Sequence, residues 1–433
     1  MNIGVIGLGY VGLTFSVVAG LKGLNVIALE KSELIKENLK KFKAHFFEPG
    51  LDDLLKVLMN RHLFVKESYA KEDIIDIFFI TVGTPLLNGS STPNYAYLES
   101  ALDAIKNVYD GSQLLVLRST IAVGTTRKLV IPYLAKIAGI SETDVLVAFC
   151  PERTIEGKAV KELQELPQII GANNKKALLL AESLFREITN TVVKVDSLEA
   201  AELIKLFNNT YRDIHFAVGN VFNEIAQGYN INGVELIQTA NLGYERSNIA
   251  LPGFVGGPCL EKDAYILTEN MQDSPGKQFV LNSRKYNESL EEQVIKWVQS
   301  HLKSTDKICI TGLPFKGRPD TSDLRGSNSI QIVHKLNQLG YHPNLHDFVA
   351  YKDEVLDTIK GNWFDDLYDA IGDCQALLIL NNHQKYSNLE LHKITAALKS
   401  ENIFILDYWS AMNQIPVKLY PNLTYITAGN ILI

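Results

Sequence analysis

The sequence NIGVIGLGYVG occupies residues 2–12 and decides the fold of the N-terminal part of the chain. Its first five residues are mostly apolar and predict a short buried strand. Three glycines follow in the spacing G-x-G-x-x-G. Gly7 permits a tight turn, Gly9 lets the backbone approach a pyrophosphate, and Gly12 lets the next helix pack closely on the strand. The helix expected over Leu13–Lys22 would offer amide donors to a phosphate at its N-terminus.

An acidic residue stands where a dinucleotide-binding fold needs one. Asn25–Leu29 predicts the second strand, and Glu30 follows it directly. A carboxylate in this place accepts hydrogen bonds from ribose hydroxyls and repels a 2′-phosphate, which favours NAD over NADP. Because strand, glycine loop, helix and acid occur in the required order, we favour this interpretation over a purely structural glycine turn.

Strands and helices alternate through the N-terminal part and again from about residue 307. The expected strands include Ile74–Val82, Leu114–Leu117, Val145–Phe149, Lys307–Thr311, Ala376–Leu380 and Ile403–Leu406. The expected helices between them include Tyr97–Val108, Thr125–Ala138 and Asn328–Leu339. This alternation predicts an α/β protein with two doubly wound, Rossmann-like domains.

A long amphipathic segment, Ser197–Tyr229, separates the two alternating regions. Its apolar residues recur at helical spacing: Ala200, Leu203, Ile204, Phe207, Tyr211, Ile214, Val218, Val221 and Ile225. A helix of this length would join two globular parts, and its apolar stripe could pair with another subunit. We therefore expect a dinucleotide-binding domain at residues 1–196, a central helical dimerisation region at 197–300 and a C-terminal domain at 301–433.

Composition excludes several classes of protein. The chain has 433 residues, 46% hydrophobic and 21% charged, and a net charge of −7, which favour a folded soluble protein without a nucleic-acid surface. Four cysteines, at 150, 259, 309 and 374, lie too far apart for a metal-ligand motif and suit a reducing cytoplasm. Residues 3–21 are uncharged, but no basic residue precedes them, so we expect neither a secretory signal nor a membrane span.

One cysteine lies in a glycine-rich turn, GGPCLEKD at residues 256–263. A nicotinamide enzyme that only interconverts an alcohol and a carbonyl needs no thiol. A thiolate beside the cofactor can trap an aldehyde as a thiohemiacetal, whose carbon can lose a second hydride to give a thioester. Cys259 therefore suggests a four-electron oxidation of a primary alcohol to an acid. The alternative is that Cys259 is a small buried hydrophobic residue.

Further motifs accompany the glycine loop and the cysteine turn. They are EPGL at 48–51, TVGTP at 81–85, ST at 119–120 with GTT at 124–126, PER at 151–153, KLFNNTY at 205–211 and GLPFKG at 312–317. With these motifs the chain resembles, nearly end to end, the nucleotide-sugar 6-dehydrogenases, which include UDP-glucose and UDP-N-acetylhexosamine dehydrogenases. The resemblance implies an NAD domain, a helical dimerisation region and a C-terminal UDP-sugar-binding domain in a homodimer or larger homo-oligomer.

The resemblance also implies catalytic roles. Six residues match positions that carry the family's chemistry: Cys259, Lys205, Asn209, Glu152, Asp263 and Thr120. Cys259 would be the nucleophile, while Thr120 and Asp263 would hold water. Glu152 would assist the thioester step, as a general base or by positioning water. Lys205 and Asn209 lie four residues apart on one helix face and can donate to an oxyanion at C6. The alternatives are ordinary helix-surface, turn and loop residues.

The ligand-binding residues follow from the same motifs. Those expected to bind NAD are Gly7, Gly9, Tyr10, Val11, Gly12, Glu30, Thr84 and Thr120. Those expected to bind the UDP-sugar are Arg153, Lys205, Asn209, Arg246, Phe254, Gly256, Lys316 and Arg325, with Arg246 expected to reach across a subunit boundary. Each cation has the alternative of a solvated surface residue. We expect no metal.

Two departures from the UDP-glucose enzymes bear on the substrate. Arg153 stands where those enzymes have an apolar residue, and an arginine offers donors to an acetamido carbonyl that glucose lacks. Glu261 stands where many relatives have proline, with an effect left open. The resemblance favours UDP-N-acetylmannosamine. The alternatives are UDP-glucose, UDP-N-acetylglucosamine or UDP-N-acetylgalactosamine, and a silent NAD- or UDP-binding regulatory subunit.

Overall fold

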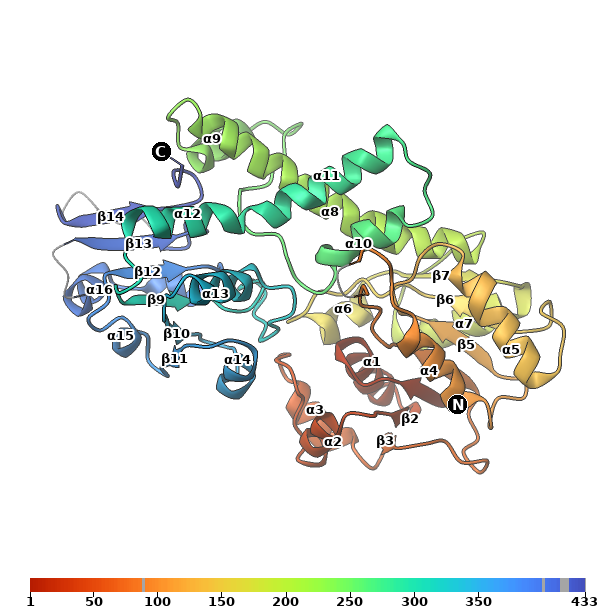
Figure 1. Cartoon of the computed structure of the whole chain (residues 1–433). Coiled ribbons are helices and arrows are strands. Elements are labelled where there is room, and N and C mark those ends of the chain that lie inside the picture. Colours follow the sequence, from red (N-terminus) through yellow and green to blue (C-terminus); the bar gives the residue numbers. More distant parts are fainter. Residues whose placement is uncertain (88–89, 399–401, 413–419, 433) are drawn as a thin grey trace. The chain divides into compact units, whose positions relative to one another are not determined.

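The computed structural model describes residues 1–87, 90–398, 402–412 and 420–432 (Figure 1). The chain divides into two compact units. The first consists of Met1–Asn209 and Tyr265–Gln272, and the second of Thr210–Ala264 and Asp273–Ile433. Helix α8, Leu198–Gln227, contributes its first turns to the first unit and its remaining turns to the second. The domain boundaries at 196 and 300 remain predictions.

The first unit is built on an eight-stranded sheet within the described residues, in the order β3-β2-β1-β4-β5-β6-β7-β8. The strands are β1 Asn2–Ile6, β2 Asn25–Leu29, β3 Leu63–Lys66, β4 Ile77–Ile80, β5 Leu114–Leu117, β6 Val147–Phe149, β7 Gln168–Ala172 and β8 Val192–Lys194. All paired strands are parallel except β6 and β7, which pair antiparallel. Because the strand order reverses between β1 and β4, the glycine turn after β1 lies at the point where such sheets bind ligands.

Helices cover both faces of this sheet. Successive strand residues point to opposite sides, so neighbouring residues of one strand pack against different helices. Phe79 belongs to the apolar cluster under α1, α3, α6 and α7, and Phe78 to the cluster under α4 and α5. The helices are α1 Tyr10–Leu21, α2 Glu33–Lys40, α3 Leu51–Leu58, α4 Ala96–Ile105, α5 Ile131–Ala138, α6 Ala159–Glu165 and α7 Lys175–Ile188. The helix expected from Thr125 begins instead with a π-helical turn, Thr126–Val130.

The second unit contains a six-stranded parallel sheet within the described residues, in the order β11-β10-β9-β12-β13-β14. Its strands are β9 Ile308–Thr311, β10 Asn344–His346, β11 Asn362–Trp363, β12 Ala376–Ile379, β13 Ile403–Asp407 and β14 Leu423–Ile426. The helices are α9 Gly233–Asn241, α10 Leu260–Thr268, α11 Pro275–Ser289, α12 Glu291–His301, α13 Asn328–Gln338, α14 Lys352–Thr358, α15 Leu367–Ala370 and α16 Leu391–Ala397, with a 3-10 turn η2 at Gln384–Asn388. Helix α10 begins in this unit and ends in the first.

These two sheets confirm the predicted α/β class with two Rossmann-like parts and a long central helix. The antiparallel β6–β7 pair is the one departure from a fully parallel first sheet among the described strands. The apolar residues 3–21 form β1, the glycine turn and α1. In the part of the chain that the structure describes, no helix has both the length and the apolar character that a membrane span requires.

Candidate active site

The glycine turn after β1 has the geometry that a dinucleotide requires. Gly7 has φ +91°, and a Cβ on Gly12 would lie 1.9 Å from the Gly7 carbonyl oxygen. A Cβ on Gly9, by contrast, would meet nothing within 4 Å. Glu30 accepts hydrogen bonds from the backbone N–H groups of Leu8 and Ser32, both at 2.8 Å. The space at Gly9 is therefore open to a ligand, and the acid that would bind the ribose also holds the turn.

These contacts predict opposite outcomes for two alanine substitutions. Gly12→Ala should destabilise the first unit, because its Cβ overlaps the Gly7 backbone. Gly9→Ala should leave the melting temperature unchanged but weaken NAD binding about tenfold or more, because the methyl group occupies the space of the pyrophosphate. Thermal unfolding and calorimetric NAD titration measure the two effects. Equal NAD affinity of Gly9→Ala and the unmodified protein would contradict the assignment.

Thr84 and Thr120 lie on the loops that follow β4 and β5. The Thr84 hydroxyl donates to the Thr120 carbonyl, so the two loops are joined where both residues are expected to contact NAD. Glu202 of α8 binds the far end of the Thr120 loop. Its carboxylate accepts from the N–H of Gly124 at 2.6 Å and from the hydroxyl of Thr126 at 2.5 Å. Burial raises the pKa of Glu202.

Tyr10 lies in the first turn of α1, and Glu48 holds its side chain. Its hydroxyl donates to Glu48 at 2.5 Å, and the same carboxylate accepts from the Gly157 N–H at 2.8 Å. Burial, together with Glu48, raises the pKa of Tyr10 far above its ordinary value. Tyr10 thus connects the cofactor helix to the loop after Glu152, while Val11 beside it is half-buried.

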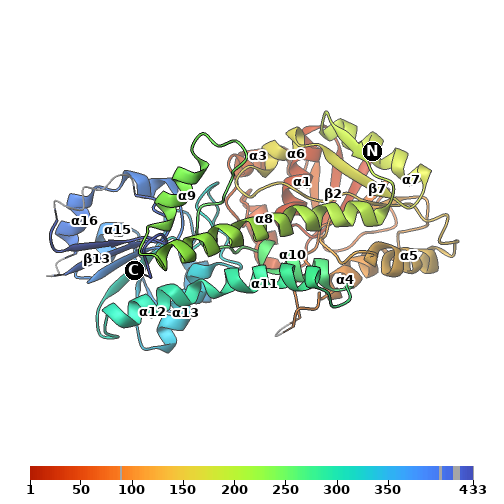
Figure 2. The same ribbon diagram turned by 90° about the horizontal axis from the view of Figure 1, so that it is seen from above.

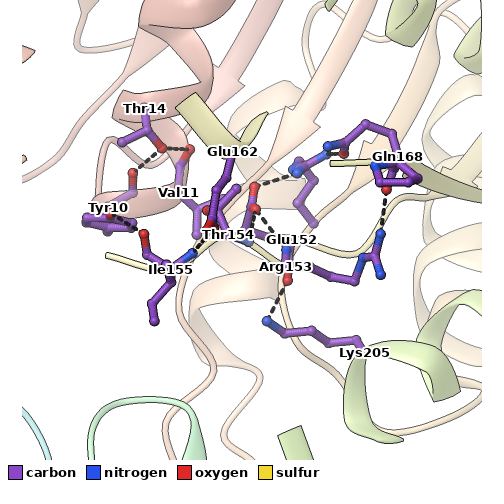
Figure 3. A network of polar contacts seen from close by, with 12 residues as sticks. Tyr10, Val11, Thr14, Glu152, Arg153, Thr154, Ile155, Glu162, Gln168 and Lys205 are labelled. Carbon is purple, nitrogen blue, oxygen red and sulfur yellow. Dashed lines mark hydrogen bonds and ion pairs between the residues drawn. The ribbon is translucent and has the colours of Figure 1, made fainter. Parts of the chain in front are cut away.

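Glu152 is buried in a polar network shown in Figure 3. Arg118 donates to one carboxylate oxygen, and the N–H groups of Arg153 and Thr154 donate to the other, each at 2.8 Å. Burial alone would raise the pKa of Glu152, but Arg118, the Thr154 N–H and Lys205 together outweigh burial and lower the pKa. The Lys205 ammonium donates to the Glu152 backbone carbonyl at 2.5 Å. The network therefore holds the expected oxyanion donor and the expected acid together.

Other members of the predicted set lie near this network. Lys205 and Asn209 are both buried side chains of α8. The Arg153 guanidinium is half-buried and donates to the Pro167 carbonyl at 2.5 Å. This bond fixes one end of the guanidinium on the first unit.

Cys259 directly precedes α10 in the second unit, and its carbonyl accepts from the Asp263 N–H at 3.0 Å. Its side chain is exposed, whereas Cys150, Cys309 and Cys374 are buried, so the alternative of a buried packing residue is wrong for Cys259. Lys262 contacts buried Asp263 at 2.7 Å. Burial lowers the pKa of Lys262, but attraction to Asp263 and Cys259 outweighs it and raises the pKa. The exposed thiol therefore lies directly before the first turn of α10, which also carries Lys262 and Asp263.

The glycines before the thiol pack against the turn that carries Arg325. The Gly257 N–H donates to the Gly326 carbonyl at 2.8 Å, and a Cβ on Gly256 would lie 2.2 Å from that oxygen. A Cβ on Gly326 would lie 2.3 Å from Glu261. Glu261, whose effect the sequence left open, therefore contacts the Arg325 turn, and burial raises its pKa.

The remaining substrate residues differ in their surroundings. Arg325 is exposed and pairs with Asp323 at 2.6 Å. The Lys316 ammonium lies 5.5 Å from the centroid of the Phe315 ring. The ring of Phe254 is buried and stacks on Tyr408 with centroids 3.9 Å apart.

Arg246 lies in an exposed segment. Its guanidinium stacks on Tyr244, 4.9 Å from the ring centroid. Across the described residues, no group of three or more His, Cys, Asp or Glu side chains is suited to hold a metal ion.

Comparison with known proteins gives the family. Residues 1–189 match the NAD binding domain of the UDP-glucose/GDP-mannose dehydrogenase family, 199–289 its central domain and 309–414 its UDP binding domain. The UDP-N-acetyl-D-mannosamine dehydrogenase of Methanocaldococcus jannaschii is 30% identical over 95% of this chain and 93% of its own length. The chain belongs to the UDP-glucose/GDP-mannose dehydrogenase family. It is therefore an oxidoreductase with an NAD-binding domain, and the predicted resemblance is confirmed.

Two further members of the UDP-glucose/GDP-mannose dehydrogenase family are similar. The UDP-N-acetyl-D-mannosamine dehydrogenase of Campylobacter jejuni is 32% identical over 77% of this chain and 82% of its own. The structure of a UDP-D-ManNAc dehydrogenase from Pyrococcus horikoshii superposes with a TM-score of 0.86 at 28% identity and covers both chains completely.

The sequence did not predict several buried charges of this family member, among them Arg118 and Glu202. Arg118 had a visible signal, because it directly follows the apolar strand Leu114–Leu117. A charge at the end of a buried strand needs a partner, and Glu152 provides it. Glu202 gave no such signal, because an exposed acid on a helix would have the same sequence neighbours.

Proposed function

We propose that this family member oxidises the C6 alcohol of a UDP-N-acetylhexosamine to the uronate, with NAD as the hydride acceptor and UDP-N-acetylmannosamine as the favoured sugar. The observation that carries the proposal is the exposed Cys259 thiol at the start of α10, beside Lys262 and Asp263, in a dehydrogenase family. A purely regulatory subunit has no need for an exposed thiol in this turn. We place the reaction in the cytoplasm, where free thiols stay reduced.

Different residues of the chain would serve different steps of the reaction. Gly7–Gly12, Glu30, Thr84 and Thr120 would hold NAD, which would supply the hydride acceptor for each of two oxidations. The first oxidation converts the alcohol to an aldehyde and releases a proton. The Cys259 sulfur then bonds to the aldehyde carbon, and the carbonyl oxygen takes a proton to give a thiohemiacetal. The second oxidation removes a hydride from that carbon and a proton from its oxygen, which gives a thioester.

Hydrolysis completes the reaction. Water attacks the thioester carbon, the carbon–sulfur bond breaks, and the carboxylate and the thiol are released. Lys205 and Asn209 would stabilise the oxyanion that develops at this carbon. Thr120 and Asp263 would hold the water. Glu152 would position it: Arg118 and two N–H groups engage the carboxylate and Arg118 lowers its pKa, which favours positioning over proton abstraction.

The N-acetylhexosamine class rests on Arg153 and on the relatives. The Arg153 guanidinium, anchored at Pro167, would donate to the acetamido carbonyl. Three relatives that are 30% identical over 95–96% of this chain are named UDP-N-acetyl-D-mannosamine dehydrogenases. Lys316, Arg325 and Arg246 would bind the anionic UDP-sugar, and the match to a UDP binding domain supports this assignment. The main chain at Phe254 and Gly256 would pass close to the sugar.

We also propose that the protein is a homodimer or a larger homo-oligomer. Large side chains on one face of α8 are exposed and recur at intervals of three, four or seven residues: Tyr211, Val218, Phe222 and Ile225. This spacing is typical of a helix that packs against another helix. Light scattering after gel filtration measures the molar mass, and a monomer would contradict the proposal.

A panel of UDP-sugars tests the proposed function. The purified protein is incubated with NAD and limiting UDP-N-acetylmannosamine, UDP-N-acetylglucosamine, UDP-N-acetylgalactosamine or UDP-glucose, and the NADH formed is compared with the sugar consumed. We expect the highest kcat/KM with UDP-N-acetylmannosamine and about two NADH per sugar, since the thioester route removes two hydrides. A ratio of one would contradict the thiol mechanism, and no NADH with any sugar would favour a regulatory subunit.

A further inference from the structure

We propose that a buried polar clamp, formed by Arg284 of α11 and Asn220 of α8, positions Cys259 for its attack on the substrate aldehyde. The proposal rests on the proposed function, because it concerns the same thiol. All the contacts that carry it lie within the second unit. In this unit α11 runs beside the later turns of α8 (Figure 2).

Arg284 holds the main chain on both sides of the thiol. Its side chain is 1% exposed, and its Nη2 donates to the Val255 carbonyl at 2.8 Å. Its Nη1 donates to the Leu260 carbonyl at 3.1 Å and to Asp213 at 2.7 Å. Val255 lies four residues before Cys259 and Leu260 one residue after it, so a single guanidinium spans the segment that bears the thiol.

Asn220 holds the same segment further upstream. Its side-chain amide donates to the Gly253 carbonyl at 3.1 Å and accepts from the Gly253 N–H at 2.9 Å. Asn287 joins the two anchors, because it accepts from Asn220 at 3.2 Å and donates to the Asp213 carboxylate at 2.9 Å. Asn220 and Asn287 are both buried. The clamp is therefore one connected network that is shielded from water.

The segment needs such a clamp because it has few side chains of its own to pack. Gly253, Gly256, Gly257 and Pro258 make up much of the stretch before the thiol. Its buried carbonyls need donors, and a backbone rich in glycine gains little order from side-chain packing. The planar arginine fork satisfies two carbonyls and a carboxylate together, which a lysine ammonium on a flexible stem does not reproduce.

The test compares Arg284→Lys and Asn220→Ala with the unmodified protein. Arg284→Lys keeps the charge opposite Asp213 and loses the fork, and Asn220→Ala removes no charge. A displaced thiol should lower kcat for uronate formation by about 100-fold, since a misplacement of about 1 Å can cost that much. It should also lower the NADH formed per sugar from about two toward one, with the aldehyde captured by hydroxylamine. KM for NAD should stay unchanged, because the cofactor residues lie in the first unit.

The NADH ratio separates positioning from mere stabilisation. Leu336→Ala serves as a matched control, because Leu336 is a fully buried core residue of α13 in the same unit. It should lower the melting temperature and leave the ratio at two. The clamp would be overturned if Arg284→Lys or Asn220→Ala lowered the melting temperature but left kcat unchanged and still gave two NADH per sugar. If Arg284→Lys gives no folded protein, Asn220→Ala decides by the same criterion. If the unmodified protein itself gives one NADH per sugar, the proposed function fails instead.

Discussion

Replacing Cys259 with alanine should abolish uronate formation and leave NAD binding intact. The sulfur is the atom that would hold the aldehyde for the second oxidation, and no other exposed cysteine occurs among the described residues. Removal of a covalent nucleophile costs up to about 10⁶-fold in kcat, so we expect a loss of at least about 10³-fold. Chromatographic detection of the uronate measures this loss, and calorimetric titration with NAD shows that the cofactor site is intact.

Cys309→Ala provides the control for this substitution. Cys309 is fully buried in β9 of the second unit, and burial raises the pKa of its thiol well above the ordinary value. Its replacement should cost some stability and leave the NADH ratio and kcat unchanged. Appreciable uronate from Cys259→Ala would show that the chemistry runs without a thioester, and the role of Cys259 would have to be abandoned.

The elements that the sequence predicted well are those with strong local signals. The G-x-G-x-x-G spacing requires close packing at Gly12, and in the structure a Cβ there would lie only 1.9 Å from the Gly7 carbonyl oxygen. The apolar strands Asn2–Ile6 and Asn25–Leu29 have the expected bounds, because fully buried parallel strands are continuous apolar runs. The long helix was also visible, because its apolar residues keep helical spacing for several turns.

What the sequence did not predict depends on partners far apart along the chain. Arg284 contacts Asp213 and both flanks of the thiol across intervals of 24 to 71 residues, and no local pattern shows that they meet. The sequence around Glu202 is that of an ordinary exposed helix acid, and only the folded structure shows that the Gly124 loop packs against it. Buried polar networks of this kind are specified by tertiary packing, so single-sequence reasoning finds their members only when a motif includes them.

Arg118→Met should destabilise the first unit by about 3–5 kcal/mol at pH 7, the usual cost of removing one partner from a buried ion pair. The pair with Glu152 has side-chain exposures of 0% and 7%, so water does not replace the lost guanidinium. Arg127→Met is the matched control: Arg127 pairs with Glu199 at the surface, with exposures of 51% and 30%, and its loss should cost at most about 1 kcal/mol. Urea unfolding followed by circular dichroism measures both. Similar losses for the two variants would contradict the assignment of Arg118 as a buried anchor.

The pH dependence of this loss identifies its cause. In the unmodified protein the pKa of Glu152 is lowered in the folded state, so its contribution to stability is present above the unfolded pKa of about 4.3 and is lost as the pH falls through the folded value. Without Arg118, burial remains and should raise the folded pKa of Glu152 above 4.3. The ionised carboxylate then opposes folding at neutral pH, and the penalty disappears on acidification. The difference in urea midpoint between Arg118→Met and the unmodified protein should therefore narrow between pH 7 and pH 4.

The double variant Arg118→Met/Glu152→Gln should recover most of the loss at pH 7, because it carries no buried charge at either position. A deficit that stays constant with pH would assign the effect of Arg118 to packing against Phe15 and Phe185 rather than to its charge.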